Sequence, residues 1–380
     1  MNQGDEHKDL GGPNESPKRT YKEGPTLAKC LLGLVMVLCC IYLMPSCRQR
    51  RMSYTFYIGR EPEADLGGQY YDEGKYQEAA DWYQKKVDEI VAEGKRYDPK
   101  YGPLYGNLGM AYYRLGEYDQ AIRYLEECAG VDERTANIEE LAWDYDALGN
   151  VYKAAGDLDE AIRFYEKGLK AVRKASGEDS EDAAVFLSDL GDTYRKNKEY
   201  EKSLDRYQQA LKIREHNGAD LTWTHIRIAR IYNDMEDYEN AEAFYKKAAL
   251  SETGDSFITG VAYYNLGQMY QNKGDYSSSF SPLSEALGRI NQDKENDYAE
   301  SCVHSALAAS YAETEPDLVK AIEEAITACR LLEQSESLKS DFSDDLEEYR
   351  EQLKGYYQTD TEDMGEEGFE VWYQEQMKGN

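Results

Sequence analysis

Apolar residues recur along the chain in a pattern that repeats about every 40 residues. Each copy opens with an apolar anchor, followed by a small residue and, four positions after the anchor, by tyrosine, as in Leu148, Gly149 and Tyr152. Positions i, i+1 and i+4 share one face of an α-helix. The anchors stand at Leu66, Leu108, Leu148, Leu190, Ile228, Leu266 and Leu307. The pattern therefore predicts seven copies of one helical unit.

A second helix follows the first in each copy. In the third copy a turn at Gly156 leads into a stripe of Ala161, Tyr165 and Leu169, which recur at i, i+4 and i+8 on one helical face. A single helical hairpin cannot bury both of its apolar faces, so each copy needs its neighbours to cover it. The sequence predicts a continuous stack of hairpins.

This pattern resembles the tetratricopeptide repeat, whose consensus small and aromatic residues match Gly149, Tyr152, Gly156, Ala161 and Tyr165. The long period and phrases such as ALKIREHNGAD are most similar to the kinesin-light-chain-like subclass. The resemblance implies an all-α fold, a right-handed α-solenoid of about seven hairpins over residues 60–335. It also implies a scaffold that binds a protein or peptide in a concave groove, with no enzyme activity.

The same resemblance assigns a wall of the groove to the first helix of each hairpin. In the family this wall is lined by the second, fifth, ninth and twelfth residues of a unit, counting the anchor as the seventh. The candidate peptide-binding residues at these positions are Trp143, Asn150, Lys153, Asp192, Arg195, Trp223, Arg230, Asn233, Tyr264, Gln268 and Gln271. Carboxamides can pair with an extended peptide backbone, and the two tryptophans can hold apolar side chains.

Three basic residues on this wall stand out in an acidic protein. Lys153, Arg195 and Arg230 are expected to receive a carboxylate or acidic side chains of a peptide ligand. The alternative is that they only neutralise Asp146 and Asp192 on adjacent helices, because exposed ion pairs of this kind contribute only about 0–1 kcal/mol.

Residues 26–47 are predicted to form a transmembrane helix. The run from Cys30 to Met44 carries no charge, and the stretch 27–47 contains Lys29 as its one charged residue. About 20 residues suffice to cross the hydrocarbon, and a lysine near one end can extend to the interface. Two alternatives stay open: a lipoprotein in which Cys47 is the lipidated residue, and another cleaved signal.

The segments beside this helix are polar. Residues 1–25 are expected to be a disordered tail, because their composition buries too little apolar area to offset the entropy of ordering. Residues 48–59 form a basic juxtamembrane segment. Basic residues flank the helix on both sides, so charge does not fix the orientation. By analogy with other single-anchor repeat proteins, the array is expected to lie outside the cytoplasm.

The C-terminal region is expected to close the stack. Residues 336–357 carry Phe342, Leu346, Tyr349 and Leu353 at helical spacing and predict a capping helix. Residues 358–380 are acidic and are expected to form a mobile tail. Aromatic residues interrupt that tail, and they leave open a second possibility, docking on the array or on a partner.

Composition excludes several classes of function. The net charge of −30 would repel a phosphate backbone, so nucleic acid is not an expected partner. The seven cysteines are dispersed without CxxC spacing, which indicates buried thiols and neither a structural zinc nor a redox pair. No phosphate loop, HExxH or nucleophile elbow occurs, so neither a cofactor nor a small-molecule substrate is expected. The competing function is a self-assembling spacer of a cell-envelope complex.

Overall fold

The computed structural model describes residues 66–252, 254–290, 297–314, 318–334, 338, 342–360 and 366–378. The chain divides into two units, Met1–Gly59 and Arg60–Asn380, and every described residue belongs to the second. The predicted tail at 1–25, transmembrane helix at 26–47 and basic segment at 48–59 lie outside the described residues. Within the described ranges, no helix has both the length and the apolar composition that crossing a membrane requires.

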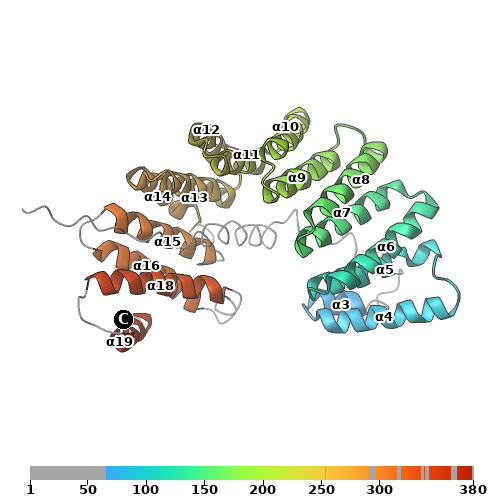
Figure 1. Ribbon diagram of the computed structural model, residues 1–380, viewed down its shortest axis with the longest axis horizontal. Coiled ribbons are helices and arrows are strands. Elements are labelled where there is room, and N and C mark those ends of the chain that lie inside the picture. Colours follow the sequence, from blue (N-terminus) through green and yellow to red (C-terminus); the bar gives the residue numbers. More distant parts are fainter. Residues whose placement is uncertain are drawn as a thin grey trace, which may run out of the picture. The chain divides into compact units, whose positions relative to one another are not determined.

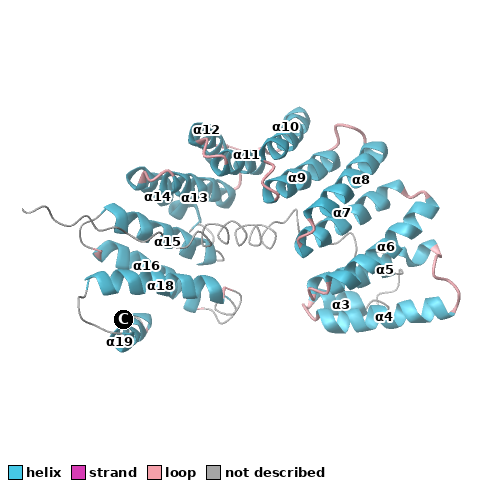
Figure 2. Ribbon diagram, in the orientation of Figure 1, coloured by secondary structure: helices cyan, strands magenta, loops and turns pink. Residues whose placement is uncertain are grey.

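The described residues form seven helical hairpins, as predicted (Figure 1). Their helix pairs are α3 (Leu66–Asp72) with α4 (Tyr76–Ala92), α5 (Gly102–Arg114) with α6 (Tyr118–Thr135), α7 (Ile138–Ala155) with α8 (Leu158–Ser176), α9 (Glu181–Lys196) with α10 (Tyr200–Asn217), α11 (Thr222–Asp234) with α12 (Tyr238–Ala249), α13 (Ser256–Asn272) with α14 (Tyr276–Ile290), and α15 (Asp297–Thr314) with α16 (Val319–Glu333). A short 3-10 turn, Pro99–Tyr101, precedes α5. All these elements are helical, and no strand occurs in the described ranges (Figure 2).

The hairpins stack in chain order. Each first helix packs on the second helix of its own hairpin, and each second helix packs on the first helix of the next. This arrangement confirms the predicted all-α repeat stack, in which contacts are almost wholly between neighbours.

The repeated sequence positions form the core of the stack. The anchor Leu148 and the second-helix residue Tyr165 are both fully buried. The same second-helix position is buried at Tyr83, Leu125, Tyr165, Tyr207, Tyr245 and Leu283. Leu66 is the exception among the anchors at 40% exposed, because no hairpin among the described residues precedes its helix. The recurring sequence positions are thus the positions that pack between helices.

The turn inside each of the first six hairpins has one residue with a left-handed backbone. Gly116 and Gly156 adopt φ of 77° and 91° there, which glycine tolerates without steric cost. The fourth and fifth hairpins place Lys198 and Glu236 at the equivalent position, each with φ of 60°. Because a side chain is strained in this region, these two turns are less favourable than the glycine turns.

The C-terminal helices differ from the sequence expectation. Helix α18 (Ser343–Asp360) packs on α16 and buries Leu346, Tyr349 and Leu353, as a capping helix should. The predicted mobile tail at 358–380 instead contains α19 (Glu366–Met377), which also packs on α16. Its Phe369 and Tyr373 are 1% and 0% exposed. The aromatic residues therefore dock on the array, which is the alternative that the sequence left open.

Candidate functional site

The candidate wall residues lie on four successive first helices, α7, α9, α11 and α13. Trp143 on α7 packs against Phe186 of α9, with ring centroids 5.6 Å apart, and is partly exposed. Trp223 on α11 is also partly exposed, although its indole Nε1 is buried and meets no acceptor among the described residues. Both tryptophans thus combine a packed ring with some accessible surface.

A buried tyrosine of the second helix, Tyr165, orients polar groups on this wall through its hydroxyl. The Tyr165 hydroxyl donates to Oδ1 of Asn150 at 2.8 Å, and Asn150 Nδ2 donates to Asp146 at 2.9 Å. Tyr165 is fully buried, so its hydroxyl needs a partner, which phenylalanine would not. This explains part of the preference for tyrosine over phenylalanine, and it fixes the carboxamide of Asn150.

Asp192 forms the acidic centre of the wall. Arg227 Nη1 donates to Asp192 Oδ2 and, at 3.2 Å, to the Tyr207 hydroxyl. Burial by itself would raise the pKa of Asp192, but the positive charges of Arg227, Lys153 and Arg195 outweigh it and lower that pKa below its usual value. Asp192 is therefore ionised at neutral pH and neutralises part of the surrounding positive charge.

Arg195 on α9 and Arg230 on α11 add two more guanidinium groups to the charged cluster. Arg195 Nη1 donates to Asp234 Oδ2 at 2.6 Å, and the two side chains are 24% and 28% exposed. Burial lowers the pKa of Arg230, and the nearby charges of Arg195 and Arg227 lower it further. We define the basic wall as Lys153, Asp192, Arg195, Arg227, Arg230 and Asp234, in which four basic side chains meet two carboxylates.

This geometry brings the predicted basic trio into one electrostatic cluster and adds residues that the sequence missed. Arg227 and Asp234 were not predicted, yet they hold the two ion pairs of the cluster. The sequence could have indicated this pair through charge complementarity between neighbouring copies, because Asp192 and Arg227 lie on successive first helices. The peptide-binding role of the wall stays a prediction.

The predicted wall residues on α13 form contacts within the stack. Tyr264 is 2% exposed, and its hydroxyl accepts a hydrogen bond from Gln268 Nε2 at 2.7 Å. Gln271 Nε2 donates to the Ala306 carbonyl at 2.6 Å and to the Ser310 hydroxyl at 2.7 Å, joining α13 to α15. These three side chains support the stack. On α11, Asn233 Oδ1 is buried and receives no hydrogen bond from the described residues.

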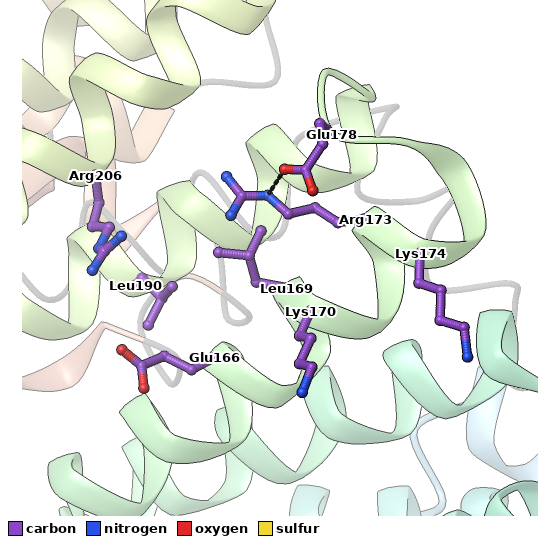
Figure 3. Close-up of a pocket in the computed structure, with 8 residues that line it drawn as sticks. All are labelled: Glu166, Leu169, Lys170, Arg173, Lys174, Glu178, Leu190 and Arg206. Atoms are coloured by element: carbon purple, nitrogen blue, oxygen red, sulfur yellow. Dashed lines mark ion pairs between the residues drawn. The ribbon is translucent and has the colours of Figure 1, made fainter.

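A hollow that the sequence did not predict lies elsewhere on the array. It has a volume of about 340 Å³ and opens between α8, α9 and α10, where Arg173 Nε and Glu178 Oε2 form an ion pair at 3.0 Å (Figure 3). Its lining residues are Glu166, Leu169, Lys170, Arg173, Lys174, Glu178, Leu190 and Arg206. A second hollow of about 470 Å³ lies between α12, α13 and α14, at the equivalent place two hairpins later. A hollow therefore occurs at this place in two copies of the repeat.

Comparison with protein-family models and with known proteins identifies the family of the repeats. One tetratricopeptide-repeat model matches residues 62–134 and 139–216, and a second matches 224–251 and 261–293, so the two together cover more than half of the chain. Among curated proteins, the Tonsoku-like protein of Mus musculus is 23% identical over 230 residues, covering 53% of this chain and 17% of that protein. The Bos taurus Tonsoku-like protein is 24% identical over 237 residues, 54% of this chain and 17% of that protein. The chain thus spans under a fifth of these relatives.

Two solved structures share the fold. The apo form of RapI is 14% identical, with a TM-score of 0.55, and the match covers 80% of this chain and 81% of that chain. The STAND protein PH0952 of Pyrococcus horikoshii, which has a tetratricopeptide-repeat sensor, is 19% identical with a TM-score of 0.55, covering 74% and 43%. The finer likeness to the kinesin-light-chain-like subclass stays a prediction. On the repeat matches and the hairpin stack, this chain belongs to the tetratricopeptide-repeat family.

Proposed function

We propose that this protein is a binding scaffold whose basic wall receives an acidic segment of a partner protein. One observation carries the proposal: the basic side chains of Lys153, Arg195, Arg227 and Arg230 gather on adjacent first helices in a chain whose net charge is −30. Tetratricopeptide repeats are scaffolds for protein–protein interaction at a general level. The chemistry of the wall narrows the partner to a peptide rich in Asp and Glu, or one ending in a free carboxylate.

The residues of the wall suit this ligand. Guanidinium groups present several N–H donors in a planar fork that matches a carboxylate, so Arg195 and Arg230 can bind acidic side chains in two-point contacts. The ion pairs with Asp192 and Asp234 hold the wall in place before the ligand arrives. The partly exposed rings of Trp143 and Trp223 add apolar area, where binding energy concentrates.

We infer further that the protein is a single-pass membrane protein tethered through residues 27–47, with the array outside the cytoplasm. The uncharged run Cys30–Met44 supports the tether. Lipidation at Cys47 would give the same tether by different chemistry, and mass spectrometry of the mature N-terminus distinguishes the two.

A selection experiment tests the scaffold function. The full chain, kept in mild detergent, is panned against a displayed library of random peptides with free C-termini. The proposal expects enriched peptides with several Asp or Glu residues and an apolar residue. Peptides without acidic enrichment would contradict the basic wall as the site. Concentration-dependent oligomers with no selected peptide would favour the self-assembling spacer instead.

A further inference from the structure

Three potential metal ligands face one another where the second hairpin meets the third, with the carboxyl of Glu140 as an electrostatic neighbour. Cys128 and Asp132 stand four residues apart on α6, and Glu140 and Asp144 stand four residues apart on α7. Residues spaced by four share one face of a helix. Since α6 packs on α7, the two pairs belong to the same interface.

Three of these side chains converge closely. The Cys128 Sγ, one oxygen of Asp132 and one of Asp144 all lie within 4.8 Å of one another. Cys128 is 3% exposed and Asp144 only 1%. The Cys128 thiol donates to Asp144 Oδ1 at 3.2 Å, while Asp144 Oδ2 is buried and receives no hydrogen bond from any N–H or thiol of the described residues. The neighbour left to this almost fully buried carboxylate is a second carboxyl, Asp132, with which Asp144 forms a side-chain hydrogen bond.

The electrostatics of the interface make this arrangement costly without a positive charge. Burial is the leading cause that raises the pKa of Cys128 and of Asp144, and it also raises the pKa of Asp132 and Glu140. Each carboxylate raises the pKa of a neighbour, and no basic side chain is among the leading causes at any of the four groups. Buried anions persist only when they are paired, protonated or bound to a metal.

We propose that Cys128, Asp132 and Asp144 bind a divalent transition-metal ion, with Zn²⁺ the best fit and Glu140 or a water as the fourth ligand. A thiolate with carboxylates selects zinc or cobalt, because magnesium and calcium favour oxygen-only sites. Zinc takes tetrahedral ligands at about 2.3 Å from sulfur and about 2.0–2.2 Å from oxygen. Ligand atoms then lie roughly 3.5 Å apart, so side-chain movements of about 1 Å close the site. Partly exposed Asp132 and Glu140 give the ion a route from solvent.

The bound ion would clamp two hairpins together. Two ligands come from the second hairpin and one or two from the third, so the metal would add a bond between repeats that also meet through side-chain packing and the Tyr145–Glu133 hydrogen bond. Binding releases the thiol proton and any proton that the carboxyls share, and affinity therefore rises with pH. One ligand, Asp144, lies on α7, the helix that also carries Trp143 and Lys153 of the candidate wall.

Cobalt spectroscopy on the full chain in detergent tests this site. Co²⁺ is added after chelation in a background where Cys30, Cys39, Cys40 and Cys47 are replaced by serine, so that the N-terminal thiols cannot respond. We expect a thiolate-to-cobalt charge-transfer band that saturates at one ion per chain and disappears when Zn²⁺ is added. Cys128→Ser should abolish the band. Cys302→Ser is the matched control, because it removes another buried thiol of the array, and should keep it.

A second variant separates metal binding from proton sharing. Asp144→Asn keeps the size of the side chain and removes its buried charge, so the variant should fold and melt at or above the wild-type temperature without metal. Zn²⁺ should raise the melting temperature of the wild type and leave that of Asp144→Asn unchanged. Absence of the cobalt band, or a band that persists in Cys128→Ser, would overturn the proposal. A wild-type melting temperature that Zn²⁺ does not change would also overturn the proposal. That result would mean that a shared proton neutralises the charge of this cluster.

Discussion

A Cβ atom on Gly149 would lie 2.6 Å from Cε1 of Tyr165, closer than non-bonded carbon atoms approach. The same relationship recurs along the array, at 2.5 Å between Gly191 and Tyr207. In the five copies where the residue after the anchor is glycine, the first helix therefore rests directly on an aromatic or leucine side chain of the second. The fold depends on the bare backbone at these crossings.

The first prediction concerns this crossing. Gly149→Ala should destabilise the array by about 1–3 kcal/mol, because the added methyl overpacks a filled contact. The free energy of unfolding is measured by denaturant titration. Gly130→Ala is the control: this glycine lies inside α6 with no atom within 4 Å of its Cβ position, and alanine there should stabilise by about 0.5–1 kcal/mol. Equal effects at the two sites would refute the packing role.

The second prediction tests the docked C-terminal helix. Tyr373 is fully buried, and its hydroxyl donates to Glu333 on α16 at 2.8 Å. Tyr373→Ala should destabilise the C-terminal end by about 3 kcal/mol through loss of packing. Val371 on the same helix is 63% exposed, and Val371→Ala should change stability by no more than about 0.5 kcal/mol. Hydrogen exchange of α16 and α19 gives the local readout, and unchanged protection in Tyr373→Ala would contradict the docking.

The third prediction is a pH dependence that comes from Asp345 on α18. Burial, followed by the charges of Glu348 and Asp344, raises the pKa of Asp345 to about 6. In the unfolded chain this pKa is about 3.9. Ionised Asp345 thus disfavours the folded state, with no effect below about pH 3 and the full effect above about pH 6. After allowance for solvent screening, Asp345→Asn should be about 1 kcal/mol more stable than wild type at pH 7.5.

Unfolding titrations at two pH values check this sign. The advantage of Asp345→Asn over wild type should shrink as the pH falls and vanish at about pH 3, where the aspartic acid is mostly neutral in both states. An advantage that grows toward acid would show that Asp345 is stabilised as the anion, which is opposite to our account.

The fourth prediction concerns the membrane tether. The full chain should stay in the membrane fraction after gentle lysis and a high-salt wash, since burial of the apolar run is favourable by about 25 cal/mol per Å². Deleting residues 1–50 should release a mostly helical protein into the soluble fraction. A full-length chain in the soluble fraction would contradict the tether. Protease added to intact cells should digest the array, and full protection would place it on the other side.

Much of the fold follows from the sequence because it is encoded by a repeat. The anchors, the small residues and the second-helix aromatic or leucine residues recur at the same spacing in the first six copies, and each copy forms one hairpin. Helix α19 escaped prediction because its segment is acidic and its aromatic residues stand in one short run instead of recurring along several turns of a helix. Its order depends on burying Phe369 and Tyr373 against distant parts of the chain, among them Tyr357, whose ring centroid lies 5.6 Å from that of Phe369.

The candidate site could be predicted only in part from the sequence, for a related reason. Repeat position alone placed Arg195 and Arg230 on the same wall, and the structure joins them electrostatically. Repeat position could not tell that Gln271 is used to bind the next hairpin, or that Arg227 pairs with Asp192. These contacts depend on side-chain partners between copies, and such partners differ from one copy to the next even where the backbone repeats.

The most direct measurement for the basic wall is the affinity of an acidic peptide from the selection for the full chain, read by fluorescence polarisation. The variant Lys153→Ala, Arg195→Ala, Arg230→Ala should bind at least tenfold more weakly, about 1.4 kcal/mol, while its melting curve shows a folded array. The matched control changes three basic residues of the hollow, Lys170, Arg173 and Arg206, to alanine and alters the net charge equally. We predict that the control keeps most of the wild-type affinity. Undiminished affinity in the folded wall variant would contradict the account.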